Sequence, residues 1–572
     1  MVSKEQIDAA RGLVPCDVNF VNCSVADLFR GEVRPGLTVS VHKGFVVGVG
    51  DGLSARTEVD LDSRVLVPGL MDSHVHIESS LLAPSEYARL VVPRGTTAVV
   101  ADPHEIANVL GYDGMTYMLR ASEGLPLDVY LMAPSCVPAT DFDSSGAALF
   151  ASDMYPFLRE PRVLGLGEVM NFPGVLAKDP QLLDKIALFW DSGKAVDGHA
   201  PELRGRDLSA YIAAGIRSDH ECVTAEEALE KISKGMHVMI REGSATRDLA
   251  SLVGAVNRRT ASRFLLCSDD RHPTDLVDEG HIDRSVRLLV EAGVDPLDAI
   301  SMATLNAARY FGLRNSGAIA PGYKADFVAA SSIREFEAEV VIKAGQIVAE
   351  GGRLVRAVES HPAVLRDSVN IKWLTEEDFR IPLEGRRIRI IEARPGTLIT
   401  GEIIAEPSVR EGLCVADPGR DLLKIFVIER HKGSGNIGKG FITGLGLKKG
   451  AIGSTISHDS HNMIVVGADD SSIFKAARHL NKIGGGMVVT DGDRIVLDLP
   501  LPIAGLMSDR DAMWVVERLK AFDELFRTEG LTNESPLMAI SFMALPVIPK
   551  LKITDRGLVD VERFVPVPLF ID

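Results

Sequence analysis

Eight short apolar segments recur in the first half of the chain, and each ends in polar residues. They are strand-sized and rich in Val, Leu and Ile, as expected for strands that are buried on both faces. Stretches with helical periodicity separate them. The segments span residues 70–76, 96–102, 128–135, 163–169, 195–199, 215–220, 236–242 and 263–270. Eight consecutive strand–helix units predict a (β/α)8 TIM barrel of the α/β class, whose strands end together at one mouth.

Two strand-rich stretches flank the predicted barrel in sequence. We expect them to pair in space as one β-sandwich. After about residue 360 strand patterns mix with long helical ones, which predicts a separate α+β domain of ordinary size. The predicted division is 1–67 for the N-terminal part of the β-sandwich domain, 68–315 for the barrel, 316–360 for the C-terminal part of the β-sandwich domain, and 361–572 for the C-terminal α+β domain.

The composition narrows the partners of the chain. A formal net charge of −17 lacks the basic footprint of nucleic-acid binders, so we expect no nucleic-acid partner. No apolar run approaches the roughly 18 residues that span a bilayer, so we expect no membrane span. The six cysteines include no CxxC pair, and the N-terminus does not resemble a signal peptide. We therefore expect a cytoplasmic protein with reduced thiols.

Metal-ligating residue types gather at the ends of the predicted strands. His74 and His76 are two residues apart on one strand, so both imidazoles project from the same face. The other strand ends contribute Glu168, His199, His220 and Asp269. Imidazole and carboxylate together suit Zn, Mn or Fe, and this many groups exceed what one ion with an open position requires. The pattern predicts a metal-dependent enzyme with a two-metal site.

The order of these groups along the chain is similar to that of the amidohydrolase superfamily. The segment GAIAPGYKADFV is also typical of that superfamily. More narrowly, VPGLMDSHVHIESS, ADPHEIANV and HDSHN resemble the bacterial adenine deaminases, and the resemblance covers essentially the whole chain. Many superfamily members bridge their metals with a carboxylated lysine, whereas this chain has Glu168 on the fourth strand, as the adenine deaminases do.

The resemblance implies a ligand set and a reaction. The expected ligands are His74, His76, Glu168 and Asp269 for one divalent ion, and Glu168, His199 and His220 for the second. Mn²⁺ is the expected ion, with Fe²⁺ or Zn²⁺ as alternatives. The implied reaction is hydrolysis of adenine to hypoxanthine and ammonia, with Asp269 carrying the proton from the activated water to the ammonia. A homo-oligomer is expected, with a dimer favoured.

Four further residues near the mouth each have two interpretations. His104 either belongs to a helix N-terminus or acts in the site, as an extra metal contact or a proton-transfer group, and the resemblance favours the site. Arg241 and Glu242 either orient the substrate or form a mutual salt bridge. Asp270 either contacts the substrate or is a solvated or helix-capping carboxylate.

The polar segment HDSHN lies far from the barrel in sequence and contains His458 and His461. It is either a satisfied hydrogen-bond network or a loop that reaches the barrel mouth and contacts the substrate. Glu202 follows His199 as HxxE, but Pro201 alters that motif, and we interpret Glu202 as a surface carboxylate.

Two rival functions stand beside the leading one. The first is another hydrolase of the same superfamily, acting on a cyclic amide or another aminated ring. The second is a catalytically silent scaffold protein with an amidohydrolase-like fold. The intact set of ligand-type residues favours an enzyme over the scaffold.

Overall fold

The computed structural model describes residues 3–358, 365, 367–533 and 535–572. Helices and strands are mixed throughout, as the sequence predicts. All eight predicted segments contain strands. These are β6 (Leu70–Val75), β7 (Thr96–Ala101), β8 (Asp128–Ala133), β9 (Val163–Val169), β10 (Ala195–Gly198), β11 (Ser218–Asp219), β12 (His237–Arg241) and β13 (Phe264–Cys267).

The eight strands form two parallel sheets that follow each other in chain order. One sheet runs from β6 to β10 and the other from β11 to β13. Backbone hydrogen bonds link the two sheets on both sides. The Arg217 N–H donates to the Val196 oxygen (3.0 Å), and the Asp269 N–H donates to the His74 oxygen (2.9 Å).

Alternate residues of each strand point to opposite sides and enter different cores. Met71, Val100 and Met132 pack with Met239 and Leu265 in one cluster that draws on both sheets. Residues on the other face pack against helices. These helices are α2 (Pro84–Val91), α4 (Tyr112–Ala121), α7 (Pro180–Asp191), α8 (Gly205–Ala213), α9 (Ala225–Ser233) and α12 (Ile282–Glu291).

The two flanking stretches pair with each other in one nine-stranded sheet. Its strands are β1 (Cys16–Asp27), β2 (Glu32–His42), β3 (Phe45–Val49), β4 (Ala55–Asp60), β5 (Val65–Pro68), β14 (Phe327–Ala330), β15 (Val340–Lys343), β16 (Gln346–Glu350) and β17 (Arg353–Leu354). Antiparallel pairing of β5 with β14 sets Val67 opposite Val328. Phe20 and Phe327 meet edge to face in a shared core, with ring centroids 6.1 Å apart.

The C-terminal part, defined as the described residues from 367 to 572, combines strands and helices as predicted. Its main sheet contains β19 (Arg387–Glu392), β20 (Gly401–Ala405), β23 (Leu423–Ile428), β24 (Ile437–Thr443), β25 (Ala451–Ser454), β26 (Met463–Gly467), β27 (Gly486–Asp491), β28 (Arg494–Pro500) and β32 (Phe570–Ile571). The long helices are α15 (Asp470–Ile483) and α16 (Ala512–Thr528). The predicted boundary at residues 360–361 lies outside the described residues.

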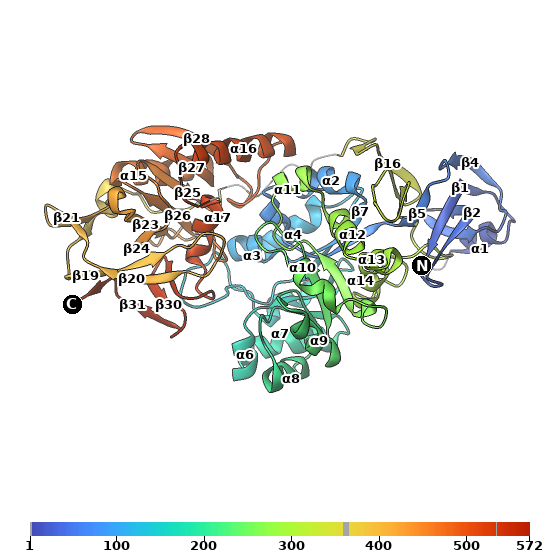
Figure 1. Cartoon of the computed structure of the whole chain (residues 1–572), viewed down its shortest axis with the longest axis horizontal. Helices are drawn as coiled ribbons and strands as arrows, with labels where there is room; N and C mark the ends of the chain where they lie inside the picture. Colours follow the sequence, from blue (N-terminus) through green and yellow to red (C-terminus); the bar gives the residue numbers. More distant parts are fainter. Residues whose placement is uncertain (1–2, 359–364, 366, 534) are drawn as a thin grey trace.

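The C-terminal part lies beside α3 (His104–Leu110) (Figure 1). The Ser508 N–H donates to the Leu81 oxygen (2.7 Å), and the Ala512 N–H donates to Glu86 Oε2 (3.0 Å). Leu81 and Glu86 belong to the segment that follows β6. The C-terminal part therefore approaches the sheets from the side on which their strands end.

Two predictions from composition can be compared with the structure. All six cysteines are buried free thiols, as expected of a protein without a disulfide framework. Across the described ranges, no helix combines the length and apolar character that a membrane crossing requires.

Candidate active site

Six predicted ligand residues come together where the parallel strands end. His74 lies on β6 and Glu168 on β9. His76, His199 and His220 directly follow the ends of their strands, and Asp269 lies two residues after the end of β13. The six residues are His74, His76, Glu168, His199, His220 and Asp269. Five of their side chains are less than a tenth exposed, but that of His199 is 27% exposed. The cluster is therefore buried, with its opening on the His199 side.

Glu168 occupies the middle of this cluster, and each carboxylate oxygen faces different imidazoles. Oε1 lies 3.3 Å from His76 Nε2 and 3.4 Å from His104 Nδ1. Oε2 lies 2.7 Å from His199 Nδ1 and 3.3 Å from His220 Nε2. One carboxylate therefore joins two groups of nitrogen donors.

Asp269 adds a second carboxylate on the side of the first strand. Its Oδ1 lies 3.1 Å from His76 Nε2 and 3.4 Å from His74 Nε2. The backbone of Asp269 adopts a left-handed conformation, with φ at 56°. Its N–H donates to the His74 oxygen and its oxygen accepts from the His76 N–H, at 2.9 and 3.2 Å. These two bonds fix the carboxylate beside the paired histidines.

The donor set fits divalent metal ions. The nearest sets of three donors include His74, His76 and Asp269, and also His74, Glu168 and His220. The backbone oxygen of Asp102 lies 2.8 Å from His76 Nδ1 and can only accept a hydrogen bond. Nδ1 therefore carries the hydrogen, and the lone pair of Nε2 is directed into the cluster. Such a carbonyl partner is the usual way in which a metal-binding imidazole is oriented.

The charges in the cluster suit the same chemistry. Burial opposes ionisation of Glu168, but His199, His220 and His76 outweigh it and hold its pKa well below the usual range. Burial opposes ionisation of Asp269 as well, but His74, His76 and Arg241 lower its pKa. Burial lowers the pKa of His74 to about 4, which keeps that imidazole neutral. At His220 the carboxylates outweigh burial and raise the pKa to about 9, and they raise those of His76 and His199 as well, so metal binding has to displace protons from these three imidazoles. Ionised carboxylates and neutral imidazoles are the forms that bind metals.

Arg241 lies beside the cluster and does not pair with Glu242. Its guanidinium donates to Asp269 Oδ2 (3.1 Å), to Asp248 Oδ2 (2.9 Å), and to Glu221 at close range. Glu242 instead pairs with Arg284 and accepts the Leu249 N–H (3.1 Å). Arg241 and Glu242 therefore do not form the mutual salt bridge that was one interpretation of the pair. Each has its own partners, and only Arg241 contacts Asp269.

Glu221 was missed by the sequence analysis. Its Oε1 lies 3.5 Å from His220 Nε2 and 3.8 Å from His199 Nδ1, so these three residues form a further group of donors. The available signal was its position next to His220. The apolar pattern ends at His220, however, and gave no indication of which way the next side chain points.

His104 combines the two interpretations that the sequence left open. It is the first residue of α3 (His104–Leu110), and its Nδ1 lies 3.4 Å from Glu168 Oε1. Burial lowers its pKa to about 4, so the ring is neutral. The neighbouring Glu105 is buried and faces the C-terminal part.

The HDSHN segment contacts Glu105, which follows the second parallel strand, and is also a hydrogen-bond network. His458 Nδ1 lies 2.8 Å from Glu105 Oε1, and His461 Nε2 contacts Glu105 Oε2. Asp270, in the segment that follows β13, accepts a hydrogen bond from Ser79 Oγ. It is only partly exposed, and burial together with Asp269 raises its pKa.

Glu202 lies at the surface, as its altered motif predicts. The residue is exposed, and its backbone has φ at 58°. Its N–H donates to Glu227 Oε1 (2.9 Å). Glu202 is part of none of the donor groups formed by the strand-end residues described above.

A buried lysine ties together the segments that carry His199 and His220. Lys231 Nζ donates to the Ala200 oxygen (2.7 Å), to Asp219 Oδ2 (2.8 Å) and to Glu227 Oε1 (2.7 Å). Asp219 also accepts the Ala200 N–H (2.7 Å). Because Ala200 follows His199 and Asp219 precedes His220, this network fixes the spacing of the two imidazoles.

Replacement of Lys231 by Met is expected to lower the free energy of unfolding by about 3–5 kcal/mol, because it leaves buried carboxylates unpaired. The measurement is denaturant unfolding in the presence of a chelator, so that metal binding does not contribute. The matched control is Lys234→Met at the end of the same helix, which removes a partly exposed pair with Glu230 (3.0 Å) and hydrogen bonds to Gly205 and Ser209. That change should cost about 1 kcal/mol or less. Equal losses in the two variants would contradict the role assigned to Lys231.

Comparison with known proteins agrees with the site. The model of the amidohydrolase family matches residues 65–348, and that of the adenine deaminase C-terminal domain matches residues 397–565. The chain is 46% identical over 571 residues to the adenine deaminase of Desulfatibacillum aliphaticivorans, with 100% of both chains covered. It is 48% identical over 570 residues to the adenine deaminase of Methanothrix thermoacetophila, again with full coverage.

The parallel sheets and the strand-end cluster define a hydrolase of the amidohydrolase family. Full-length relatives at this level of identity narrow the assignment further. The chain belongs to the adenine deaminase family.

Proposed function

We propose that this chain hydrolyses adenine to hypoxanthine and ammonia. The observation that carries the proposal is the convergence of four imidazoles on Glu168 and Asp269 where parallel strands end. The names of the full-length relatives give the substrate. In the reaction, water supplies the oxygen at the ring carbon, and the exocyclic amine leaves as ammonia.

We propose that two divalent ions are held by the residues that the family pattern predicts. His74, His76, Glu168 and Asp269 would hold one, and Glu168, His199 and His220 the other. Bound metal lowers the pKa of water to about 7 and so supplies a hydroxide nucleophile at neutral pH. Mn²⁺ is the ion we expect, with Fe²⁺ or Zn²⁺ as alternatives, because all three accept imidazole and carboxylate ligands.

Asp269 is the proposed carrier of the proton. Its two oxygens have different surroundings, since Oδ1 faces the paired histidines and Oδ2 faces Arg241. The guanidinium holds the carboxylate ionised and fixes its orientation. Asp269 can then take a proton from water and release it to the departing ammonia. The neutral His104 beside Glu168 is the second candidate for a proton-transfer role.

The substrate contacts proposed from the sequence divide into two groups. His458 contacts Glu105 near the strand ends, and the Asp270 charge acts on His458, which supports a role for both in holding the purine. Arg241 reaches the cluster through Asp269. Glu242 is engaged with Arg284, and both ring nitrogens of His461 are engaged by neighbours. These contacts favour structural roles for Glu242 and His461 over direct contact with the substrate.

We also propose that the two parallel sheets are halves of one closed (β/α)8 barrel spanning residues 68–315. The shared interior cluster and the hydrogen bonds between the sheets support closure. The flanking sheet supports a β-sandwich domain built from 1–67 and 316–360, with residues 361–572 as the C-terminal domain. A cytoplasmic location and a homodimeric assembly remain predictions from sequence.

The substrate proposal is tested by incubating the metal-loaded protein with adenine, adenosine, guanine and cytosine. We expect ammonia release and the ultraviolet change of hypoxanthine formation with adenine, faster by orders of magnitude than with the others. A closed pocket would exclude the ribose of adenosine, and such steric exclusion discriminates strongly. Comparable turnover of adenosine, or no turnover of adenine in the presence of manganese or iron, would overturn the substrate while leaving a metal-dependent hydrolase.

A further inference from the structure

We infer that His458, supplied by the C-terminal part, is a catalytic acid that protonates the purine ring nitrogen beside the reacting carbon, and that Glu105 positions it. This inference rests on the proposed deamination of adenine. It gives the C-terminal part a direct role in the reaction.

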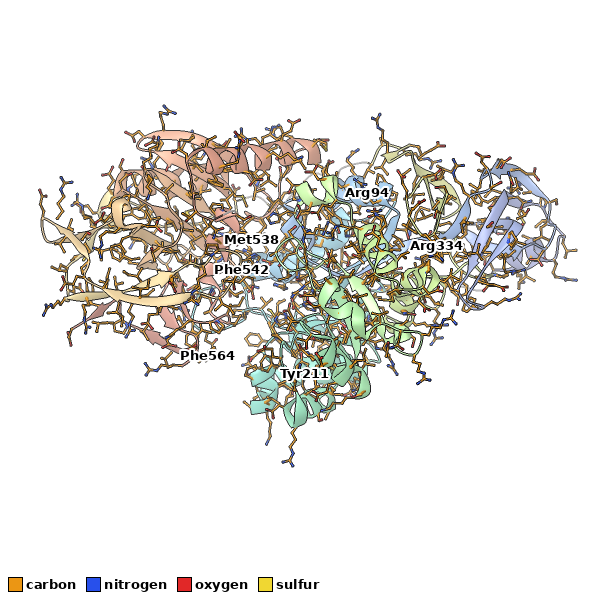
Figure 2. The ribbon with its side chains drawn as sticks, viewed as in Figure 1. Arg94, Tyr211, Arg334, Met538, Phe542 and Phe564 are labelled. Carbon is orange, nitrogen blue, oxygen red and sulfur yellow. The ribbon has the colours of Figure 1, made fainter. Side chains whose placement is uncertain are left out.

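The His458 ring is held on one edge and on one face. Nδ1 lies 2.8 Å from Glu105 Oε1, and the ring stacks on Phe542 with centroids 4.4 Å apart and planes 15° apart. Phe542 lies on the side of the C-terminal part that faces the helices of the first half of the chain (Figure 2). The backbone N–H of His458 also donates to the backbone oxygen of Ser541 (3.0 Å). Within the part of the chain that the structure describes, no group makes a hydrogen bond to His458 Nε2.

The orientation of Glu105 is fixed by the other histidine of the segment. The Ser457 N–H donates to His461 Nδ1 (3.1 Å), so that nitrogen is unprotonated. The hydrogen of a neutral His461 is therefore on Nε2, which donates to Glu105 Oε2. An imidazole with this hydrogen position has no lone pair left for a metal. The cluster of Glu105, His458 and His461 is accordingly a hydrogen-bonded triad, and Glu105 has one oxygen on each histidine.

The triad keeps His458 charged at neutral pH. Burial lowers the pKa of His458, but Glu105 outweighs this effect and raises it to about 9. Asp270 and Asp459 also stabilise the charge. Burial opposes ionisation of Glu105 too, yet His458 and His461 hold its pKa below the usual range. His458 therefore has a proton on Nε2 that it can give to a bound molecule.

The position of the triad suits a substrate bound over the cluster. Glu105 directly follows His104, whose Nδ1 is 3.4 Å from Glu168 Oε1. On the other side, the Asp270 charge that acts on His458 directly follows Asp269. His458 therefore lies beside the segment that follows the second parallel strand, within reach of the Asp270 charge. Glu202, the acid that follows His199 in sequence, is exposed and cannot serve the same purpose.

The reaction needs such a proton donor. When hydroxide forms a bond to the amine-bearing carbon, the adjacent carbon–nitrogen double bond opens and its electron pair moves to the ring nitrogen. The His458 Nε2–H bond then breaks, and the ring nitrogen takes the proton. Ammonia leaves as the carbon–nitrogen single bond breaks and the carbonyl of hypoxanthine forms. Of the two protons of water, one leaves with ammonia through Asp269 and the other restores His458.

The test compares the metal-loaded wild-type protein with His458→Gln, Glu105→Gln and the double variant. We expect His458→Gln to lower kcat on adenine by about 10²-fold or more, the usual loss for a general acid. KM and bound metal should stay close to wild type. Because Glu105 acts through His458, the double variant should be no slower than His458→Gln. If Glu105 and His458 had purely structural roles, their separate losses of kcat would multiply in the double variant. Metal content or KM would then change as well.

The matched control is His479→Gln. His479 Nε2 also pairs with a carboxylate, Asp498 Oδ2 at 2.8 Å, but within the C-terminal part and away from the mouth. Its kcat should equal that of the wild type. If His458→Gln does not fold, Glu105→Gln decides, and wild-type kcat in a folded, metallated Glu105→Gln protein would overturn the inference. A wild-type protein inactive on adenine would contradict the proposed function, whereas an active wild type with an equally active His458→Gln variant would contradict this inference alone.

Discussion

Replacement of Glu168 by Gln is expected to abolish deamination of adenine and to reduce bound metal sharply. One carboxylate faces His76 and His104 through one oxygen and His199 and His220 through the other. An amide of the same size keeps one oxygen but loses the charge that joins the two groups of imidazoles. The measurements are metal analysis of the purified variant and ammonia release, which should fall to the background rate.

The matched control for this variant is Glu202→Gln, a change of the same chemistry at an exposed position close in sequence to His199. It should keep both metal content and turnover. The Glu168→Gln protein should remain folded, because Glu168 is surrounded by polar ligand-type groups and contributes nothing to the apolar cores. Wild-type turnover by a Glu168→Gln protein would contradict the central role of this carboxylate.

The second large effect is expected from Asp269→Asn. The amide keeps an oxygen that can still face His74 and His76, so metal should be retained, but it cannot accept a proton. The kcat on adenine should fall by about 10²-fold or more, the typical loss when a general base is removed. Steady-state kinetics and metal analysis on the same preparation separate the two effects.

A control for Asp269→Asn is Asp248→Asn, which removes the carboxylate that Arg241 Nε contacts at 2.9 Å. Asp248 is part of none of the donor groups around Glu168, so the loss of kcat should be much smaller. A nearly unchanged kcat in a fully metallated Asp269→Asn protein would show that another group carries the proton, and His104 would be the first to examine.

The parallel strands and the six ligand-type residues could be predicted because both leave local signals. Continuous apolar segments such as 163–169 are buried along their whole length, which gives a recognisable run of Val, Leu and Gly. His74 and His76 share a face because they are two residues apart. Residues at the ends of parallel strands lie close together whatever the conformation of the connecting loops. The order of the ligand types along the chain was therefore sufficient to predict which residues form the cluster.

The partners of the charged groups could not be predicted, because they are set by packing between distant segments. Glu105 and His458 are 353 residues apart in sequence, and only the docking of the C-terminal part brings them together. A mutual salt bridge was one of the two interpretations of Arg241 and Glu242, but successive residues at a strand end point to opposite sides. Arg241 therefore reaches Asp269 while Glu242 reaches Arg284.

The most direct test of this account is a metal titration of chelator-treated protein, with adenine turnover as the readout. We predict no turnover in the metal-free protein, a rise as Mn²⁺ is added, and a plateau near two ions per chain. The Glu168→Gln protein should show no such rise. Full turnover of adenine by demonstrably metal-free protein, or no turnover at any metal load, would contradict the proposal that this buried cluster of imidazoles and carboxylates holds metal ions and hydrolyses adenine.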